Sequence, residues 1–194
     1  MAAPPRGGTL RLATCGTGPL TDELWASAAR WTGTEVANIY GITETGWIAG
    51  SVAASGRVAA AGGLSPWGTV VRVLAGTGTA APALSLRRCE PGEVGHVWVQ
   101  SPSLMSGYFE RDDLTDAVLA GGWFDTGDLG TLDAQGRLVL HGREREQINV
   151  GGAKVYPADV DAIVGTAGDV IDACTFAVSD PLLGQSVATA VVLG

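Results

Sequence analysis

The apolar positions of this 194-residue chain first follow the pattern of a strand, a helix and a second strand. Residues 10–14 and 36–40 are short, mainly apolar stretches that predict strands. Between them Leu24, Ala28 and Trp31 recur at helical spacing behind a Thr-Asp-Glu start, which places a capping hydroxyl and two acids at the positive end of a helix. This order of elements predicts parallel α/β packing.

From about residue 67 the pattern changes to short strands separated by turns. Residues 69–74 and 95–100 predict strands, and the alternation in the second is that of a half-buried strand. Residues 112–120 predict a short helix with aspartate caps, which ends at a Gly-Gly pair. Residues 130–140 predict a hairpin with its turn in an Asp-Ala-Gln-Gly stretch. Residues 50–65 are rich in Ala, Gly and Ser and give no clear signal.

The charge density rises sharply at residues 143–146, where we place a boundary. Residues 148–156 predict a hairpin that turns at a Gly-Gly pair, and Pro157 opens a helix at the position where its missing N–H costs least. Residues 172–178 and 187–193 predict two further strands. The helix is expected to bury an apolar stripe formed by Val160, Ile163 and Val164.

Composition removes several classes of function. Acidic residues outnumber basic ones by 20 to 12, and the net charge of −8 argues against a nucleic-acid partner, because such proteins need basic surfaces. No apolar run approaches the ~18 residues of a membrane span. Residues 1–8 contain Pro and Gly in place of an apolar signal core, so secretion is not indicated.

The cysteines and histidines argue against a metal centre or a hydrolytic triad. The three cysteines are widely spaced, which is typical of reduced thiols in the cytoplasm. His96 and His141 lie outside any Ser or Cys motif and outside ligand spacing. Lys154 is the only lysine, so any step in this chain that requires a lysine depends on that residue.

Four segments contain residue types that bind nucleotides, and each also has a structural interpretation. Residues 40–44 offer a ring for a base, a hydroxyl for a phosphate and a carboxylate for Mg²⁺, or form a glycine turn. Asp128 accepts hydrogen bonds from two ribose hydroxyls, or lies exposed in a capped turn. The alternating charges of residues 142–148 are typical of a solvated linker between domains. Residues 151–157 let a ligand approach the backbone or form a glycine hairpin.

The order of these segments resembles that of the adenylate-forming enzymes: the acyl-CoA synthetases, the nonribosomal adenylation domains and the luciferases. The resemblance rests on Tyr-Gly-x-Thr-Glu at 40–44, Thr-Gly-Asp at 126–128, and Gly-Arg with the Ile-x-x-x-Gly-x-Lys-Val-x-Pro run over 142–157. It extends over residues 10–193 and matches only the C-terminal part of the family's large domain and the start of its small domain. Residues 148–157 are most similar to the acyl-CoA synthetases, which implies fatty acid metabolism.

The resemblance implies an ATP-dependent ligase that converts a carboxylic acid into an acyl-adenylate and passes the acyl group to a thiol. The expected cofactors are ATP or AMP and Mg²⁺, with CoA or the phosphopantetheine of a carrier protein as acceptor. The resemblance places Gly16, Thr17, Gly18 and Pro19 in the adenine and acyl pocket, Tyr40 on adenine and Gly41 beside the acyl group. It implies a catalytic pair, with Thr43 at the α-phosphate and Glu44 on Mg²⁺. It also implies that Asp128 and Arg143 bind the ribose, that Arg145 is the hinge, and that Gly151 and Gly152 face pantetheine.

The chain also departs from the family pattern. Arg145 stands where the family commonly has Asp or Lys. The family's phosphate loop and its C-terminal catalytic lysine are not found among these residues, and Lys154, in the glycine loop, cannot replace that lysine. Because cations at the reacting phosphate are a large catalytic term, we expect this chain alone to have activity near background. Two alternatives are a split-enzyme subunit that binds a complementary synthetase chain, and a module that binds acyl-adenylate without catalysis.

The expected fold class is α+β. We expect a strand–helix–strand remnant with an exposed apolar patch, then a small distorted β-barrel over residues 66–141. The expected domains are a partial large-domain region over 1–142, a hinge at 143–145 and a small α/β C-terminal lobe over 146–194.

Overall fold

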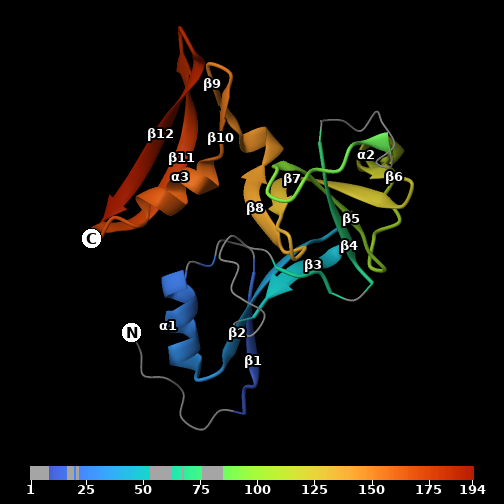
Figure 1. Cartoon of the computed structure of the whole chain (residues 1–194), viewed down its shortest axis with the longest axis horizontal. Helices are drawn as coiled ribbons and strands as arrows, with labels where there is room; N and C mark the ends of the chain where they lie inside the picture. Colours follow the sequence, from blue (N-terminus) through green and yellow to red (C-terminus); the bar gives the residue numbers. More distant parts are fainter. Residues whose placement is uncertain (1–8, 17–19, 21, 53–62, 67, 76–84) are drawn as a thin grey trace. The chain divides into compact units, whose positions relative to one another are not determined.

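The computed structural model describes residues 9–16, 20, 22–52, 63–66, 68–75 and 85–194 (Figure 1). The chain divides into two compact units, which are described separately. Unit 1 comprises Met1–Thr126 and Gly130–Leu140, and unit 2 comprises Gly127–Leu129 and His141–Gly194. Three of the expected site residues lie outside the described residues: Thr17, Gly18 and Pro19.

The first sheet of unit 1 confirms the predicted strand–helix–strand order. β1 (Leu12–Cys15) pairs in parallel with β2 (Glu35–Ile42), and α1 (Asp22–Thr32) connects them. The helix ends at Gly33, whose φ of +66° favours glycine. β3 (Gly46–Ser51), which pairs antiparallel with β2, was not predicted.

Two apolar clusters of unit 1 include residues of this sheet. On one face α1 lies along the sheet and buries Trp25 against Leu20 and Val36 (Figure 1). The Trp25 indole also donates a hydrogen bond to the Val36 carbonyl, with Nε1 and O 2.9 Å apart. A second core cluster combines residues of this sheet with residues of the following one: Tyr40, Ile48, Ala49, Val73, Val97, Val99 and Leu138.

The second sheet has five strands in the order β4-β5-β7-β6, with β8 paired to β7. Its elements are β4 (Val70–Leu74), β5 (Gly95–Gln100), α2 (Asp112–Val118), β6 (Leu119–Ala120), β7 (Trp123–Leu132) and β8 (Leu138–Arg143). The predicted hairpin is confirmed. The Asp133 carboxylate accepts hydrogen bonds from the backbone N–H groups of Gln135 and Arg137, both at 2.9 Å, and closes the turn between β7 and β8.

Two details of the sequence prediction for this sheet were wrong. β5 is not half-buried, because every residue except Gln100 is buried: Val97 and Val99 pack in one cluster and Trp98 in another. The aspartates do not cap α2 either. Its N-cap is Arg111 without a side-chain cap bond, and the aspartates occupy the first turn, where their charge favours the helix N-terminus.

Unit 2 contains a four-stranded antiparallel sheet in the order β10-β9-β12-β11. Its elements after β8 are the short 3-10 turn η3 (Glu144–Glu146), β9 (Ile148–Val150), β10 (Ala153–Val155), α3 (Pro157–Val164), β11 (Val170–Asp180) and β12 (Gly184–Leu193). The predicted Gly-Gly hairpin and the helix opened by Pro157 are confirmed, and α3 lies beside β11 (Figure 1). The expected stripe is only partly buried, because Ile163 is 71% exposed.

The described residues form a mixed α/β fold of mostly strands, with three helices and three sheets. The expected apolar patch stays a prediction, and the N-terminal region exposes these large apolar side chains: Leu10, Leu12, Leu24, Trp31 and Trp47. The domain limits at 142 and 146 and the hinge between them stay predictions. Among the described helices, none combines the length and apolar character needed to cross a bilayer.

Candidate functional site

The turn between β2 and β3 contains Thr43 and Glu44. The turn depends on close backbone packing at Gly41, where an added Cβ would lie 2.5 Å from the Gly46 carbonyl oxygen. The pairing register also shifts between Tyr40 and Gly41. Gly46 has a φ of +70°, which other residues rarely adopt. The sequence therefore folds into a tight turn that leaves Thr43 exposed and Glu44 half-buried.

Glu44 is held by a segment far along the chain. The Tyr108 hydroxyl donates to Glu44 Oε1 at 2.8 Å, and the Met105 N–H donates to the Glu44 carbonyl at 2.8 Å. The Ser101 hydroxyl donates to the Thr45 carbonyl at 3.2 Å. Burial, and then the bond to Glu44, raise the pKa of the Tyr108 phenol, so the hydroxyl stays protonated and remains a donor. Nothing in the sequence spacing pairs Tyr108 with Glu44, so the sequence did not predict this contact.

Tyr40 and Gly16, expected at the nucleotide, lie on neighbouring strands or their ends. Tyr40 is only 9% exposed and packs in the core with Ile48 and Ala49, so its ring presents little free surface for a base in this form. An added Cβ at Gly16 would lie 3.1 Å from Cγ1 of Ile39 and 3.2 Å from its carbonyl oxygen. Glycine at this position therefore allows close packing against β2. The nucleotide roles of both residues stay predictions.

Asp128 and Arg143 come together within unit 2. Arg143 Nε lies 3.3 Å from Asp128 Oδ1, and the carboxylate side chain is 9% exposed while the guanidinium side chain is 45% exposed. Each follows a glycine with positive φ, Gly127 at +69° and Gly142 at +113°. A buried carboxylate beside an exposed guanidinium presents an acceptor and a donor together, which suits a ligand rich in hydroxyls.

Gly151 and Gly152 form the exposed turn between β9 and β10. The Gly151 N–H donates to the Leu183 carbonyl at 3.0 Å, and the Gly152 N–H donates to Asn149 Oδ1 at 2.9 Å. An added Cβ at Gly151 would lie 2.9 Å from Leu183 Cδ2. Both N–H groups are therefore used within the protein, so any ligand here would meet the open Cα side of Gly152. Arg145 lies exposed in η3.

His141 is a second polar residue that the sequence did not single out. Its Nδ1 lies 3.3 Å from Asp159 Oδ2, and its ring centroid lies 5.6 Å from that of Tyr156. This contact connects β8 to α3. Burial, then the nearby Asp159 charge, raise the pKa of Tyr156, although a hydrogen bond from Gln147 opposes the shift.

The site fits Mg²⁺ only in combination with a nucleotide. No group of three or more His, Cys, Asp or Glu side chains that could hold a metal occurs in the described part of the chain. Mg²⁺ is, however, commonly bound by one or two carboxylates together with substrate phosphates. The single Glu44 carboxylate, with hard oxygen donors beside the exposed Thr43 hydroxyl, is compatible with that arrangement.

Comparison with known proteins defines the class. A family model described as AMP-binding enzyme matches residues 2–109, and the chain belongs to this family. It is 32% identical over 191 residues to an indoleacetate–CoA ligase of Aromatoleum aromaticum, covering 95% of this chain and 35% of that protein. It is also 36% identical over 129 residues to a sulfoacetate–CoA ligase of Cupriavidus necator, covering 66% of this chain and 24% of that protein.

Solved structures support the same assignment. The o-succinylbenzoate CoA synthetase of Bacillus subtilis, in complex with the acyl-adenylate OSB-AMP, matches with a TM-score of 0.83 and 27% identity over 99% of this chain and 38% of that one. An amide bond synthetase of Marinactinospora thermotolerans matches with a TM-score of 0.79 and 30% identity over 95% of this chain and 37% of that one. The chain thus spans between 24% and 38% of the length of these relatives.

Proposed function

We propose that this chain contributes the adenylate-binding part of an ATP-dependent acid–thiol ligase. In the first step a carboxylate oxygen of the acid attacks the α-phosphorus of ATP and pyrophosphate leaves. In the second step the sulfur of CoA or of a carrier-protein phosphopantetheine attacks the acyl carbon and AMP leaves. Membership of the AMP-binding family and the CoA ligases among its relatives support this proposal.

The observation that carries the proposal is the Asp128–Arg143 pair. The carboxylate of Asp128 is an acceptor shielded from water, and Arg143 lies 3.3 Å away with an exposed side chain. In the proposed complex Asp128 accepts hydrogen bonds from both ribose hydroxyls and Arg143 donates to one of them. Hydrogen bonds to a charged acceptor contribute about 1.5–3 kcal/mol each, which is enough to select a nucleoside.

The turn after β2 supplies the phosphate contacts in this proposal. The exposed Thr43 hydroxyl donates to an α-phosphate oxygen, and Glu44 holds Mg²⁺, which offsets the phosphate charge when it is bound. Gly41 keeps the backbone beside the acyl group free of a side chain, and Gly16 lines the adenine and acyl pocket. Tyr40 stacks on adenine only if ligand binding uncovers its ring.

Unit 2 supplies the thiol half-reaction in the same proposal. Gly151 and Gly152 face the pantetheine arm, and the exposed Arg145 acts as the hinge residue of a small C-terminal lobe. The five-stranded sheet of residues 70–143 is interpreted as the distorted barrel of the family's large domain. The relatives are CoA ligases of different acids: indoleacetate, sulfoacetate and long-chain fatty acids.

Calorimetric titration of the 194-residue chain with a non-hydrolysable acyl-adenylate mimic tests the proposal. We expect the wild-type chain to bind and Asp128→Ala to bind about a hundredfold or more weakly, because two bonds to a charged acceptor are lost. Asp113→Ala is the matched control. It removes an exposed carboxylate that pairs with Arg111, and it should leave the affinity unchanged.

Equal binding by wild type and Asp128→Ala would contradict the proposal. So would a folded wild-type chain that does not bind the mimic. That second result would favour the alternative of a subunit that binds a complementary synthetase chain through the exposed apolar side chains of residues 10–47.

A further inference from the structure

The segment between β5 and α2 directs one side chain at the turn after β2. Tyr108 is held from α2, because its backbone N–H donates to Thr115 Oγ1 at 2.9 Å and Thr115 Oγ1 donates to the Arg111 carbonyl at 3.0 Å. Gly107 passes so close to this threonine that an added Cβ would lie 3.0 Å from its Cγ2. Tyr108 is therefore held in place through its backbone, and its side-chain hydroxyl donates a hydrogen bond to Glu44 Oε1 at 2.8 Å.

The two oxygens of the Glu44 carboxylate differ in their contacts. Oε1 accepts from Tyr108, and the Met105 N–H fixes the Glu44 backbone through its carbonyl. Among the described residues, no hydrogen bond to Oε2 accompanies these contacts. A glutamate has three side-chain torsions, so a hydrogen bond that selects one rotamer reduces the entropy lost when the other oxygen binds a ligand.

We propose that Tyr108 is a positioning residue that orients the Glu44 carboxylate so that its second oxygen stays available to nucleotide-bound Mg²⁺. The proposal rests on the proposed function, since it requires Glu44 to hold Mg²⁺. Hydrogen bonds that orient a metal-binding carboxylate typically change metal affinity by about 10–100-fold when they are removed.

The experiment measures how strongly Mg²⁺ improves ATP binding. The 194-residue chain is titrated calorimetrically with ATP in Mg²⁺ and again in EDTA, and the ratio of the two affinities is the magnesium dependence. Tyr108→Phe should lower this ratio about tenfold and leave the affinity in EDTA unchanged. Tyr156→Phe, which removes another half-buried phenol hydroxyl, is the matched control and should leave the ratio unchanged.

A double-mutant cycle separates positioning from general damage to the fold. Glu44→Gln should abolish the magnesium dependence, and adding Tyr108→Phe to it should lower the ratio no further, because the hydroxyl acts through the carboxylate. The backbone amide signals of Glu44 and Thr45 provide a second readout. They should keep their positions in Tyr108→Phe, because the Met105 bond to the Glu44 carbonyl remains.

Three results would overturn the inference: an unchanged magnesium dependence in Tyr108→Phe, additive losses in the double mutant, or a wild-type chain whose ATP affinity does not respond to Mg²⁺. Each leaves the proposed function to be decided separately. The acyl-adenylate mimic carries no pyrophosphate, so its Asp128-dependent binding requires neither Mg²⁺ nor Tyr108.

Discussion

The two units differ in how they are held together. The described residues of unit 1 form three apolar clusters, in which large side chains such as Trp25 and Trp98 are about 1% exposed. In the described part of unit 2 only four side chains are buried: Asp128, Leu129, Ile148 and Thr175. The same unit exposes large apolar side chains, among them Ile163 at 71% and Leu182 at 90%.

Hydrogen bonding defines unit 2 more than apolar burial does. β11 and β12 pair in register over almost their whole length, and the Thr175 and Thr189 hydroxyls lie 2.8 Å apart across them. Regions with few buried apolar side chains open locally at low free energy. The turn with Glu44 therefore lies on a scaffold with its own core, whereas Asp128 and Arg143 lie in a unit of lower expected local stability.

The largest predicted effect is on the core of unit 1. Trp25→Ala removes a side chain that is 1% exposed and its bond to the Val36 carbonyl, and we expect a loss of about 3–5 kcal/mol of unfolding free energy. Ile163→Ala in unit 2 should change it by less than about 0.5 kcal/mol, because the side chain is 71% exposed. Urea unfolding followed by circular dichroism measures both. Equal urea midpoints for the two variants would mean that apolar burial does not stabilise unit 1 more than unit 2.

The sequence predicted the elements that depend on neighbouring residues. The turn at Asp133 needs only the carboxylate and two N–H groups a few residues away. The turn between β9 and β10 uses positive φ at Gly151 and Gly152, and Pro157 needs only a helix start. Local chemistry decides these features, so they can be recognised without knowledge of the fold.

The sequence could not predict contacts made by the fold. The alternation of residues 95–100 predicted a half-buried strand, but packing buries His96 and Trp98 as well, to 6% and 1% exposure. β3 follows the turn at Glu44 and shows no strand signal of its own, because its pairing with β2 depends on glycines at close approach. Family resemblance suggested Glu44 as a ligand, but the Tyr108 hydroxyl that holds it lies 64 positions away.

The second prediction compares one glycine in each unit. Gly41→Ala should cost about 1–3 kcal/mol, because its Cβ would lie 2.5 Å from the Gly46 backbone oxygen and the turn holding Glu44 would have to move. Gly168→Ala in unit 2 meets no atom within 4 Å and has no positive φ, so it should be neutral or stabilising by up to about 1 kcal/mol. Thermal unfolding measures both. A neutral Gly41→Ala would mean that the turn is not tightly packed.

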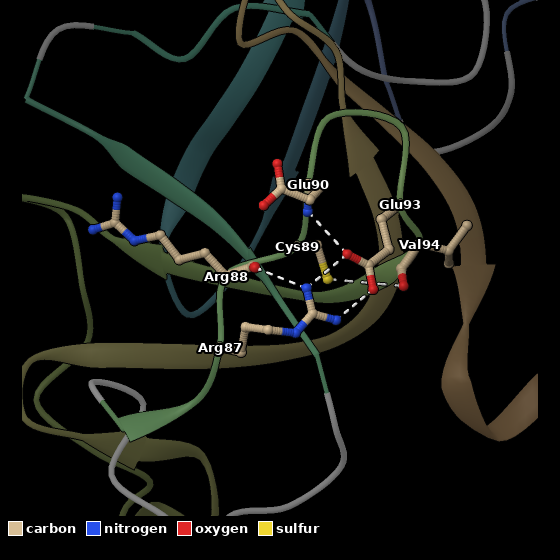
Figure 2. A network of polar contacts seen from close by, with 6 residues as sticks. All are labelled: Arg87, Arg88, Cys89, Glu90, Glu93 and Val94. Atoms are coloured by element: carbon tan, nitrogen blue, oxygen red, sulfur yellow. Dashed lines mark hydrogen bonds and ion pairs between the residues drawn. The ribbon is translucent and has the colours of Figure 1, made fainter.

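The smallest predicted effect concerns two half-buried carboxylates, Glu93 and Asp180, which have different partners. In unit 1 the Arg87 guanidinium donates to both oxygens of Glu93, and the Glu90 N–H donates to one of them (Figure 2). These contacts lower the pKa of Glu93 from 4.5 to about 2. In unit 2 the backbone N–H groups of Leu183 and Leu182 lower the pKa of Asp180.

A carboxyl pKa that is lower in the folded state than in the unfolded state means that folding favours the charged form of the group. The contribution of Glu93 is therefore fully present above pH 4.5 and is lost as the pH falls towards about 2. Arg87→Ala should return the Glu93 pKa towards 4.5 and leave Asp180 unchanged, because backbone donors hold the second carboxylate. A carboxyl-carbon NMR titration measures both groups. Because salt screens charge pairs, 1 M salt should raise the pKa of Glu93 more than that of Asp180. Equal shifts of the two pKa values would mean that the two carboxylates do not differ in their dependence on an ion pair.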